Sequence, residues 1–91
     1  MPRFFFNVFD GSATIDEVGV ELDDLAAARE AAVEEARAVI VEQVRRGHVD
    51  LSHRIEVEDE ERRPVLLLPF SAAVEIDGPV NKGGQAELID S

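Results

Sequence analysis

Residues 23–47, DDLAAAREAAVEEARAVIVEQVRRG, form the most regularly patterned segment of the chain, and they predict a helix over residues 24–46. Asp23 or Asp24 is placed to cap its N-terminus, and Gly47 suits the left-handed residue that ends many helices. The stripe expected to face a sheet begins with small side chains, which allow close packing. It consists of Leu25, Ala28, Ala32, Ala36, Val39 and Ile40.

The C-terminal half of this segment is apolar over a wider arc than one sheet face requires. In residues 39–44, VIVEQV, the side chain of Val41 lies farthest from the main stripe. β-branched residues are stiff at χ1 and favour strands. A strand over residues 39–44 is therefore the competing prediction.

On the N-terminal side of the helix, the sequence predicts a β-hairpin. Residues 3–9, RFFFNVF, are typical of a strand, and Asp10-Gly11 supplies a turn signal. The second strand is expected over residues 17–22, EVGVEL, with Val18, Val20 and Leu22 in phase. Alternation along the first strand places Phe4, Phe6 and Val8 on one face and Phe5 and Phe9 on the other.

On the C-terminal side, a second hairpin is expected after a loop. Residues 54–59, RIEVED, alternate between apolar and polar, which predicts a strand with one wet face. Residues 64–70, PVLLLPF, predict a strand that is apolar on both faces. Pro64 and Pro69 either bracket a short strand or mark an edge strand. Residues 71–76 either extend this strand or form a separate arm.

Strand, strand, helix, strand, strand is the order of an α+β fold, ββαββ. We expect one domain over residues 1–77, with the long helix packed on one face of a mostly antiparallel sheet. Residues 78–91 are Gly-rich and weakly patterned, and they predict a flexible acidic C-terminal tail.

The two strands with apolar residues on both faces predict a surface for self-association. One helix covers only one face of a sheet, and an exposed apolar patch usually marks an interaction site. A second copy of the chain is the simplest partner, because symmetric dimers are the commonest assemblies. Alternatively, residues 71–77 fold back over the patch. The expected surface comprises Phe5, Phe9, Val41, Leu66, Leu68 and Phe70.

Composition narrows the classes of function. The chain has 91 residues and a net charge of −11, from 20 acidic and 9 basic residues spread along its length. This charge opposes binding to nucleic acid or anionic membranes and favours a basic protein partner. Cysteine is absent from the sequence, which excludes disulfides and Cys-ligated metals. No signal peptide or membrane span is recognisable, so a cytoplasmic location is predicted.

The sequence contains no recognisable catalytic or metal-binding pattern. His48 and His53 flank Asp50, but their spacing in a loop matches no standard metal site. Serines lie outside any nucleophile motif, acidic clusters lack the register of a calcium loop, and residues 78–84, GPVNKGG, match no phosphate-binding loop. We therefore predict no metal, no cofactor and no enzymatic activity.

Three strings in order resemble a family of short bacterial proteins, an uncharacterised domain of unknown function. They are PRFFFNVFDG, DEVGVELDDLAAAR and IEVEDE…PVLLLPF, and together they extend over about residues 2–70. The chain departs from the family pattern at Phe4 (usually Tyr), Asn7 (often His) and Phe9 (often Arg), and it lacks Gly in the second turn. The resemblance implies no particular activity.

The hairpin and Ala-rich helix are also similar to those of HicB-type antitoxins, although the Pro-Gly turn before the helix and a DNA-binding tail are missing. Taken together, the sequence predicts a non-catalytic protein-interaction or regulatory module that self-associates. The alternative is an antitoxin-like binder of a small basic protein.

Overall fold

The predicted helix is present as α1, Leu25–Arg45, in the computed structural model, which describes residues 1–77. The side chain of Asp24 caps its start by accepting a hydrogen bond of 2.8 Å from the backbone N–H of Ala27. Gly47, with φ of +79°, follows its end in the left-handed conformation. The tail predicted over residues 78–91 lies outside the described residues.

The competing strand over residues 39–44 is wrong, because this segment continues the helix. Helical spacing places Ile40 on the same buried face of the helix as Ala28, Ala32 and Ala36. These three alanines are fully buried, and their small side chains bring the helix close to the sheet. Leu25, at the start of the expected stripe, is instead about half exposed.

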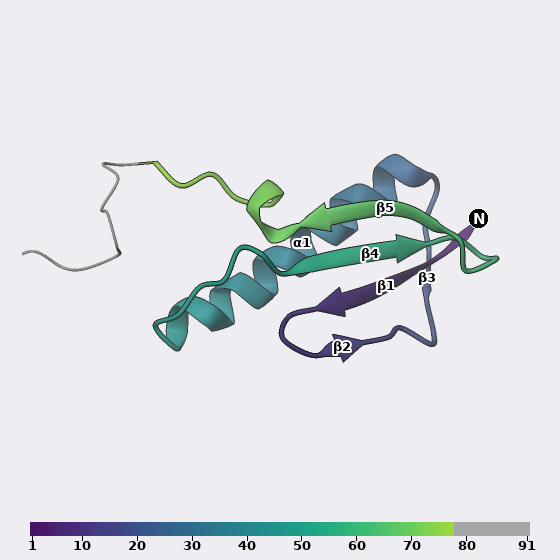
Figure 1. Cartoon of the computed structure of the whole chain (residues 1–91). Helices are drawn as coiled ribbons and strands as arrows, with labels where there is room; N and C mark the ends of the chain where they lie inside the picture. Colours follow the sequence, from purple (N-terminus) through teal and green to yellow (C-terminus); the bar gives the residue numbers. More distant parts are fainter. Residues whose placement is uncertain (78–91) are drawn as a thin grey trace, which may run out of the picture.

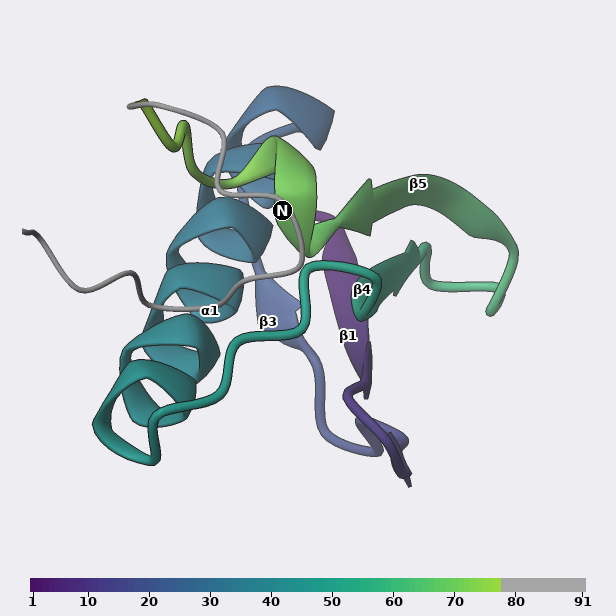
Figure 2. The same cartoon turned by 60° about the vertical axis from the view of Figure 1, so that its left-hand side comes forward.

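The remaining elements form one antiparallel sheet, so the α+β fold is confirmed. Strand order is β2-β1-β4-β5, and β3 pairs with the other end of β1 (Figure 1). Figure 2 shows α1 on one side of this sheet. The strands are β1 (Arg3–Phe9), β2 (Ala13–Thr14), β3 (Val20–Glu21), β4 (Arg54–Glu58) and β5 (Pro64–Pro69).

The second strand differs from the prediction. In place of one strand over residues 17–22, two short strands flank a loop of residues 15–19, and Val18 is exposed rather than in phase with the core. Gly19 helps to interrupt the strand, because its φ is +76°. A Cβ atom there would lie 2.8 Å from Cγ of Arg3 and 3.0 Å from the carbonyl oxygen of Phe4.

The C-terminal hairpin is present, and its register decides which apolar face meets the helix. Ile55 and Val57 on β4 are fully buried, and they pair with Leu68 and Leu66 on β5. The side chains of these four residues therefore face α1. β5 begins at Pro64 and ends at Pro69, and it is an edge strand of the sheet within residues 1–77.

Residues 71–77 form no strand. A short 3₁₀ turn, η1 (Phe70–Ala72), follows β5 directly, and Ala73 is buried in the core beneath α1. Nε of Arg37 on the helix donates a hydrogen bond of 2.8 Å to the carbonyl oxygen of Ala73. This segment thus packs beside the helix and not over the opposite face of the sheet.

The turn between β4 and β5 places a non-glycine residue in the left-handed region. Arg62 has φ of +65° in this turn, which contains no glycine. Its guanidinium lies 4.0 Å from the ring centre of Phe5, pairs with Glu58 at 3.4 Å and donates to the carbonyl oxygen of Asp16 at 3.0 Å. These contacts offset the free-energy cost of a positive φ at a non-glycine residue.

This balance predicts an order of stability among variants of the turn. Arg62→Ala is expected to lower the free energy of unfolding by about 1–2 kcal/mol, because it loses the contacts and keeps the strained backbone. Arg62→Gly is expected to be about 1 kcal/mol more stable than Arg62→Ala, since glycine accepts a positive φ. Urea unfolding followed by circular dichroism measures both. Equal stability of the two variants would contradict this account of the turn.

Candidate functional site

The six residues predicted to form one surface do not lie together. Leu68 and Phe70 are 2% and 0% exposed in the core beneath α1, and Leu66 packs against that core. Val41 is half exposed on the helix. The predicted surface is therefore wrong in composition. On β5, Leu66 and Leu68 face the helix, and the other apolar residues of the strand, Val65 and Leu67, face away from it.

Phe5 and Phe9 do lie on the outer face of the sheet, the face opposite α1, but arginines cover their rings. The guanidinium of Arg54 on β4 lies 4.4 Å from the ring centre of Phe9, its register partner on β1. Arg62 lies in the same way over Phe5. Such cation–π contacts use the face of an aromatic ring while keeping the charge hydrated. Which arginine covers which ring depends on the register between β1 and β4, and the alternation of residues along a single strand does not give that register.

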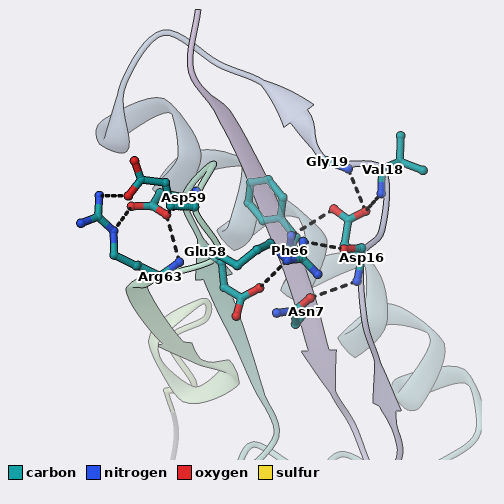
Figure 3. A network of polar contacts seen from close by, with 10 residues as sticks. Phe6, Asn7, Asp16, Val18, Gly19, Glu58, Asp59 and Arg63 are labelled. Carbon is teal, nitrogen blue, oxygen red and sulfur yellow. Dashed lines mark hydrogen bonds and ion pairs between the residues drawn. The ribbon is translucent and has the colours of Figure 1, made fainter.

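At the other border of the sheet, Asp16 joins the interrupted strand to β1 (Figure 3). Its carboxylate accepts hydrogen bonds of 3.0 Å from the backbone N–H groups of Phe6, Val18 and Gly19. In return, the backbone N–H of Asp16 donates to the side-chain oxygen of buried Asn7 at 3.0 Å. Side chains thus make the connections that a continuous ladder would have made.

These hydrogen bonds also set the charge state of Asp16. Partial burial raises the pKa of its carboxyl, but the donors on Gly19, Phe6 and Val18, together with the charge of Arg62, lower it by more. The net pKa lies below the ordinary value of 3.8. Asp16 is therefore ionised at neutral pH, and the loop that it organises carries a fixed negative charge.

A groove lies between this loop and the helix. Its volume is about 540 Å³, which is within the range of small binding pockets. The loop and the two short strands form one wall, the helix forms the other, and β1 lies beneath. The lining residues are Phe6, Val8, Thr14, Ile15, Asp16, Glu17, Val20, Ala31 and Glu35.

Apolar side chains and carboxylates meet in this groove. Ile15 and Val20 are each 48% exposed, although they are large aliphatic residues beside a buried core. Glu17 on the loop and Glu35 on α1 are exposed at opposite walls. The arrangement suits an apolar side chain that carries, or lies next to, a positive charge.

Sequence reasoning missed this groove. The sequence predicts one continuous strand over residues 17–22, with Val20 in phase, and such a strand leaves no groove beside the helix. A usable signal was present in Asp16-Glu-Val-Gly19, since an aspartate followed three residues later by glycine is typical of a side-chain-capped turn. Such a turn interrupts a strand and leaves a gap beside it.

The loop between α1 and β4, which contains His48 and His53, is held to the helix by contacts of His53. Nδ1 of His53 lies 3.0 Å from Nε2 of Gln43, and Nε2 of His53 lies 3.3 Å from Asp50. Its ring packs edge-on against Phe70 at 5.7 Å. Ser52 donates to Asp50 and lowers the pKa of that carboxyl, so the serine hydroxyl is directed at the aspartate and not at the histidine. This geometry joins the loop to α1 and differs from that of a nucleophile with its base.

Among residues 1–77, no cluster of three or more His, Cys, Asp or Glu side chains could hold a metal ion. In the same residues, no helix combines the length and apolar character needed to cross a bilayer.

Comparison with known proteins gives one match. A family model described as a domain of unknown function, DUF6894, matches residues 3–71. Searches of curated proteins and of solved structures found no match. The similarity to HicB-type antitoxins therefore stays a prediction from the sequence.

Proposed function

Since the chain belongs to the DUF6894 family, whose domain has no known function, we propose from its own residues that it is a small non-catalytic protein-interaction module. The groove between α1 and the loop of residues 15–19 is its binding site. Its partner is a basic protein, which presents an apolar segment flanked by lysine or arginine. A cytoplasmic location fits this proposal, because the chain has no cysteine to stabilise it in an oxidising compartment.

The observation that supports this proposal most strongly is the combination of exposed Ile15 and Val20 with carboxylates on both walls. Isolated exposed aliphatic residues are common on protein surfaces. Here, however, two of them line a groove of about 540 Å³ together with Phe6 and Val8. Apolar side chains supply affinity in such a groove, and the carboxylates supply selectivity for positive charge.

The charge of the whole chain acts in the same direction. A net charge of −11 attracts a basic partner over a distance of about one Debye length, ~8–10 Å at physiological salt. It also opposes nucleic acid and anionic membranes. Binding is therefore expected to weaken as salt concentration rises.

A labelled peptide of alternating lysine and leucine is a suitable probe, with binding followed by fluorescence anisotropy. The double variant Glu17→Gln/Glu35→Gln is expected to bind it about fivefold more weakly, because two exposed charge contacts are lost. The matched control is Glu30→Gln/Glu34→Gln, which makes the same change in charge elsewhere on the helix.

Two peptide controls separate the apolar from the electrostatic contribution. Replacing lysine by glutamate, or leucine by serine, is expected to abolish measurable binding. Equal weakening by both double variants would mean that only net charge attracts the peptide. That outcome, or tight binding of the serine peptide, would overturn the proposed groove.

A further inference from the structure

The loop of residues 15–19, which forms one wall of the groove, is held by two arginines through its backbone carbonyl groups. Nη1 of Arg3 on β1 donates a hydrogen bond of 2.9 Å to the carbonyl oxygen of Val18. Nη1 of Arg62 donates one of 3.0 Å to the carbonyl oxygen of Asp16. Arg3 therefore holds the end of the loop, and Arg62 holds its start.

Arg62 reaches this loop from a turn that is distant in the sequence. It follows β4, 46 positions after Asp16, and its side chain extends across the outer face of the sheet. There the guanidinium pairs with Glu58 on β4 at 3.4 Å and lies 4.0 Å from the ring centre of Phe5 on β1. A single side chain thus connects β4, β1 and the loop.

The turn holds the backbone of Arg62 in the left-handed region, with φ of +65°. The carboxylate of Asp59 accepts hydrogen bonds of 2.9 Å from the backbone N–H groups of Glu61 and Arg63. The backbone N–H of Arg62 in turn donates to the carbonyl oxygen of Asp59 at 2.9 Å. Residues held in such sparsely populated conformations cluster at functional sites. A glycine would meet the requirements of the turn, so the arginine is explained by what its side chain contacts.

Arg62 does not itself line the groove, whose lining residues belong to β1, β2, the loop, β3 and α1. It does, however, donate to Asp16, and the carboxylate of Asp16 accepts from the backbone N–H groups of Val18 and Gly19. Both walls of this arrangement are joined through side chains, so the loop depends on each of these contacts. Arg62 can therefore affect a partner in the groove by two routes, the position of the loop and the charge of its guanidinium.

We propose that Arg62 is a positioning residue for the groove, and that it raises the affinity for the basic partner without contacting it. This role rests on the proposed function, because that function places the partner in the groove. By holding the carbonyl oxygen of Asp16, Arg62 keeps the loop ordered before the partner arrives. Without this contact, the partner must order the loop on binding, and the free-energy cost of doing so lowers its affinity.

Loop position and charge predict opposite effects when Arg62 is replaced. Arg62→Gln removes a positive charge from an acidic chain, which by itself strengthens the attraction for a basic peptide. A less ordered loop instead weakens binding. Arg63→Gln is the matched control, because it makes the same change of charge in the same turn. The guanidinium of Arg63 pairs with Asp59 at 3.1 Å and with Glu61 at 2.9 Å, and Figure 3 shows Arg63 and Asp59 apart from the loop.

Fluorescence anisotropy with the peptide of alternating lysine and leucine compares the variants in the full chain. Arg62→Gln is expected to bind about threefold more weakly than wild type, because one exposed set of contacts is lost, and Arg63→Gln at least as tightly as wild type. Arg62→Gly and Arg62→Ala are expected to bind equally weakly, although the glycine variant should be the more stable of the two. Affinity that does not follow stability distinguishes positioning from a general loss of folded protein.

Amide hydrogen exchange of the free protein tests the loop without any peptide. Arg62→Gln is expected to exchange several-fold faster than wild type at Val18 and Gly19, but not at Val57 in β4, whereas Arg63→Gln leaves all three amides unchanged. Failure of wild type to bind the peptide would overturn the proposed function, and exchange alone would then decide whether Arg62 holds the loop. Unchanged exchange at Val18 and Gly19 in Arg62→Gln would overturn the positioning role, and so would peptide binding as tight as that of Arg63→Gln.

Discussion

Phe70→Ala is expected to lower the free energy of unfolding by about 3–5 kcal/mol, the usual cost of removing a buried phenylalanine ring. The side chain is fully buried beneath α1, and its ring packs against His53. Small domains have a total stability of only about 5–15 kcal/mol. The variant should therefore be partly unfolded at moderate temperature, which far-UV circular dichroism during urea titration would reveal.

Phe9→Ala is the matched control for the opposite face of the sheet. Its ring is half-buried under Arg54, so we expect a loss of about 1–2 kcal/mol from partial burial and the cation–π contact. The difference between the two variants reports which face meets the helix. A larger loss for Phe9→Ala than for Phe70→Ala would reverse the assignment of the faces.

Asp16→Ala is expected to cost about 2–3 kcal/mol, because three backbone N–H groups lose a charged acceptor. The groove should be affected as well, since the loop that forms one wall is held by these hydrogen bonds. Urea unfolding measures the stability. Slower-exchanging amides at Phe6 and Gly19 in wild type than in the variant would place the loss at the loop.

The pH dependence of Asp16→Asn tests the role of its charge. The folded-state pKa of Asp16 is lowered, so its contribution to stability is present above the ordinary value of 3.8 and is lost as pH falls through the folded value. The gap in unfolding free energy between wild type and Asp16→Asn should thus be largest near about pH 7 and shrink by about pH 3. Asp50 and Asp59, whose pKa values are also lowered, are common to both proteins and cancel in this difference. A gap that is unchanged over this range would assign no role to the charge of Asp16.

The helix and the class of fold could be predicted because their patterns have one interpretation. Ala28, Ala32 and Ala36 recur every four residues, and Asp24 and Gly47 are placed at the ends. Tertiary packing then overrode the β-branched preference of residues 39–44, since Ile40 completes the buried stripe. Local propensity is a weak guide wherever such a stripe continues.

The facing of β5 could not be predicted from its own residues, because both alternate sets are apolar. Only the register with β4 decides it, since buried Ile55 and Val57 pair with Leu68 and Leu66. The arginine over Phe9 depends on register for the same reason. Strand alternation gives two faces and leaves open which of them a helix covers.

The groove could not be predicted from sequence periodicity, because it depends on a tertiary hydrogen bond between Asp16 and β1. Residues 17–22 alternate as a strand should, yet the carboxylate of Asp16 bonds the backbone of Phe6 and the chain turns away at Gly19. A side chain thereby replaces a ladder partner, and the edge opens next to the helix. Such a replacement is visible in sequence only as an aspartate near a glycine.

The location of peptide binding tests the interaction-module proposal most directly. ¹⁵N-labelled protein is titrated with the peptide of alternating lysine and leucine, and amide chemical shifts are followed by NMR. The amides of Phe6, Ile15, Glu17, Ala31 and Glu35, which line the groove, should move together and saturate, while those of β5 stay in place. Shifts confined to residues outside the groove, or no saturable shifts at all, would contradict the proposed binding site.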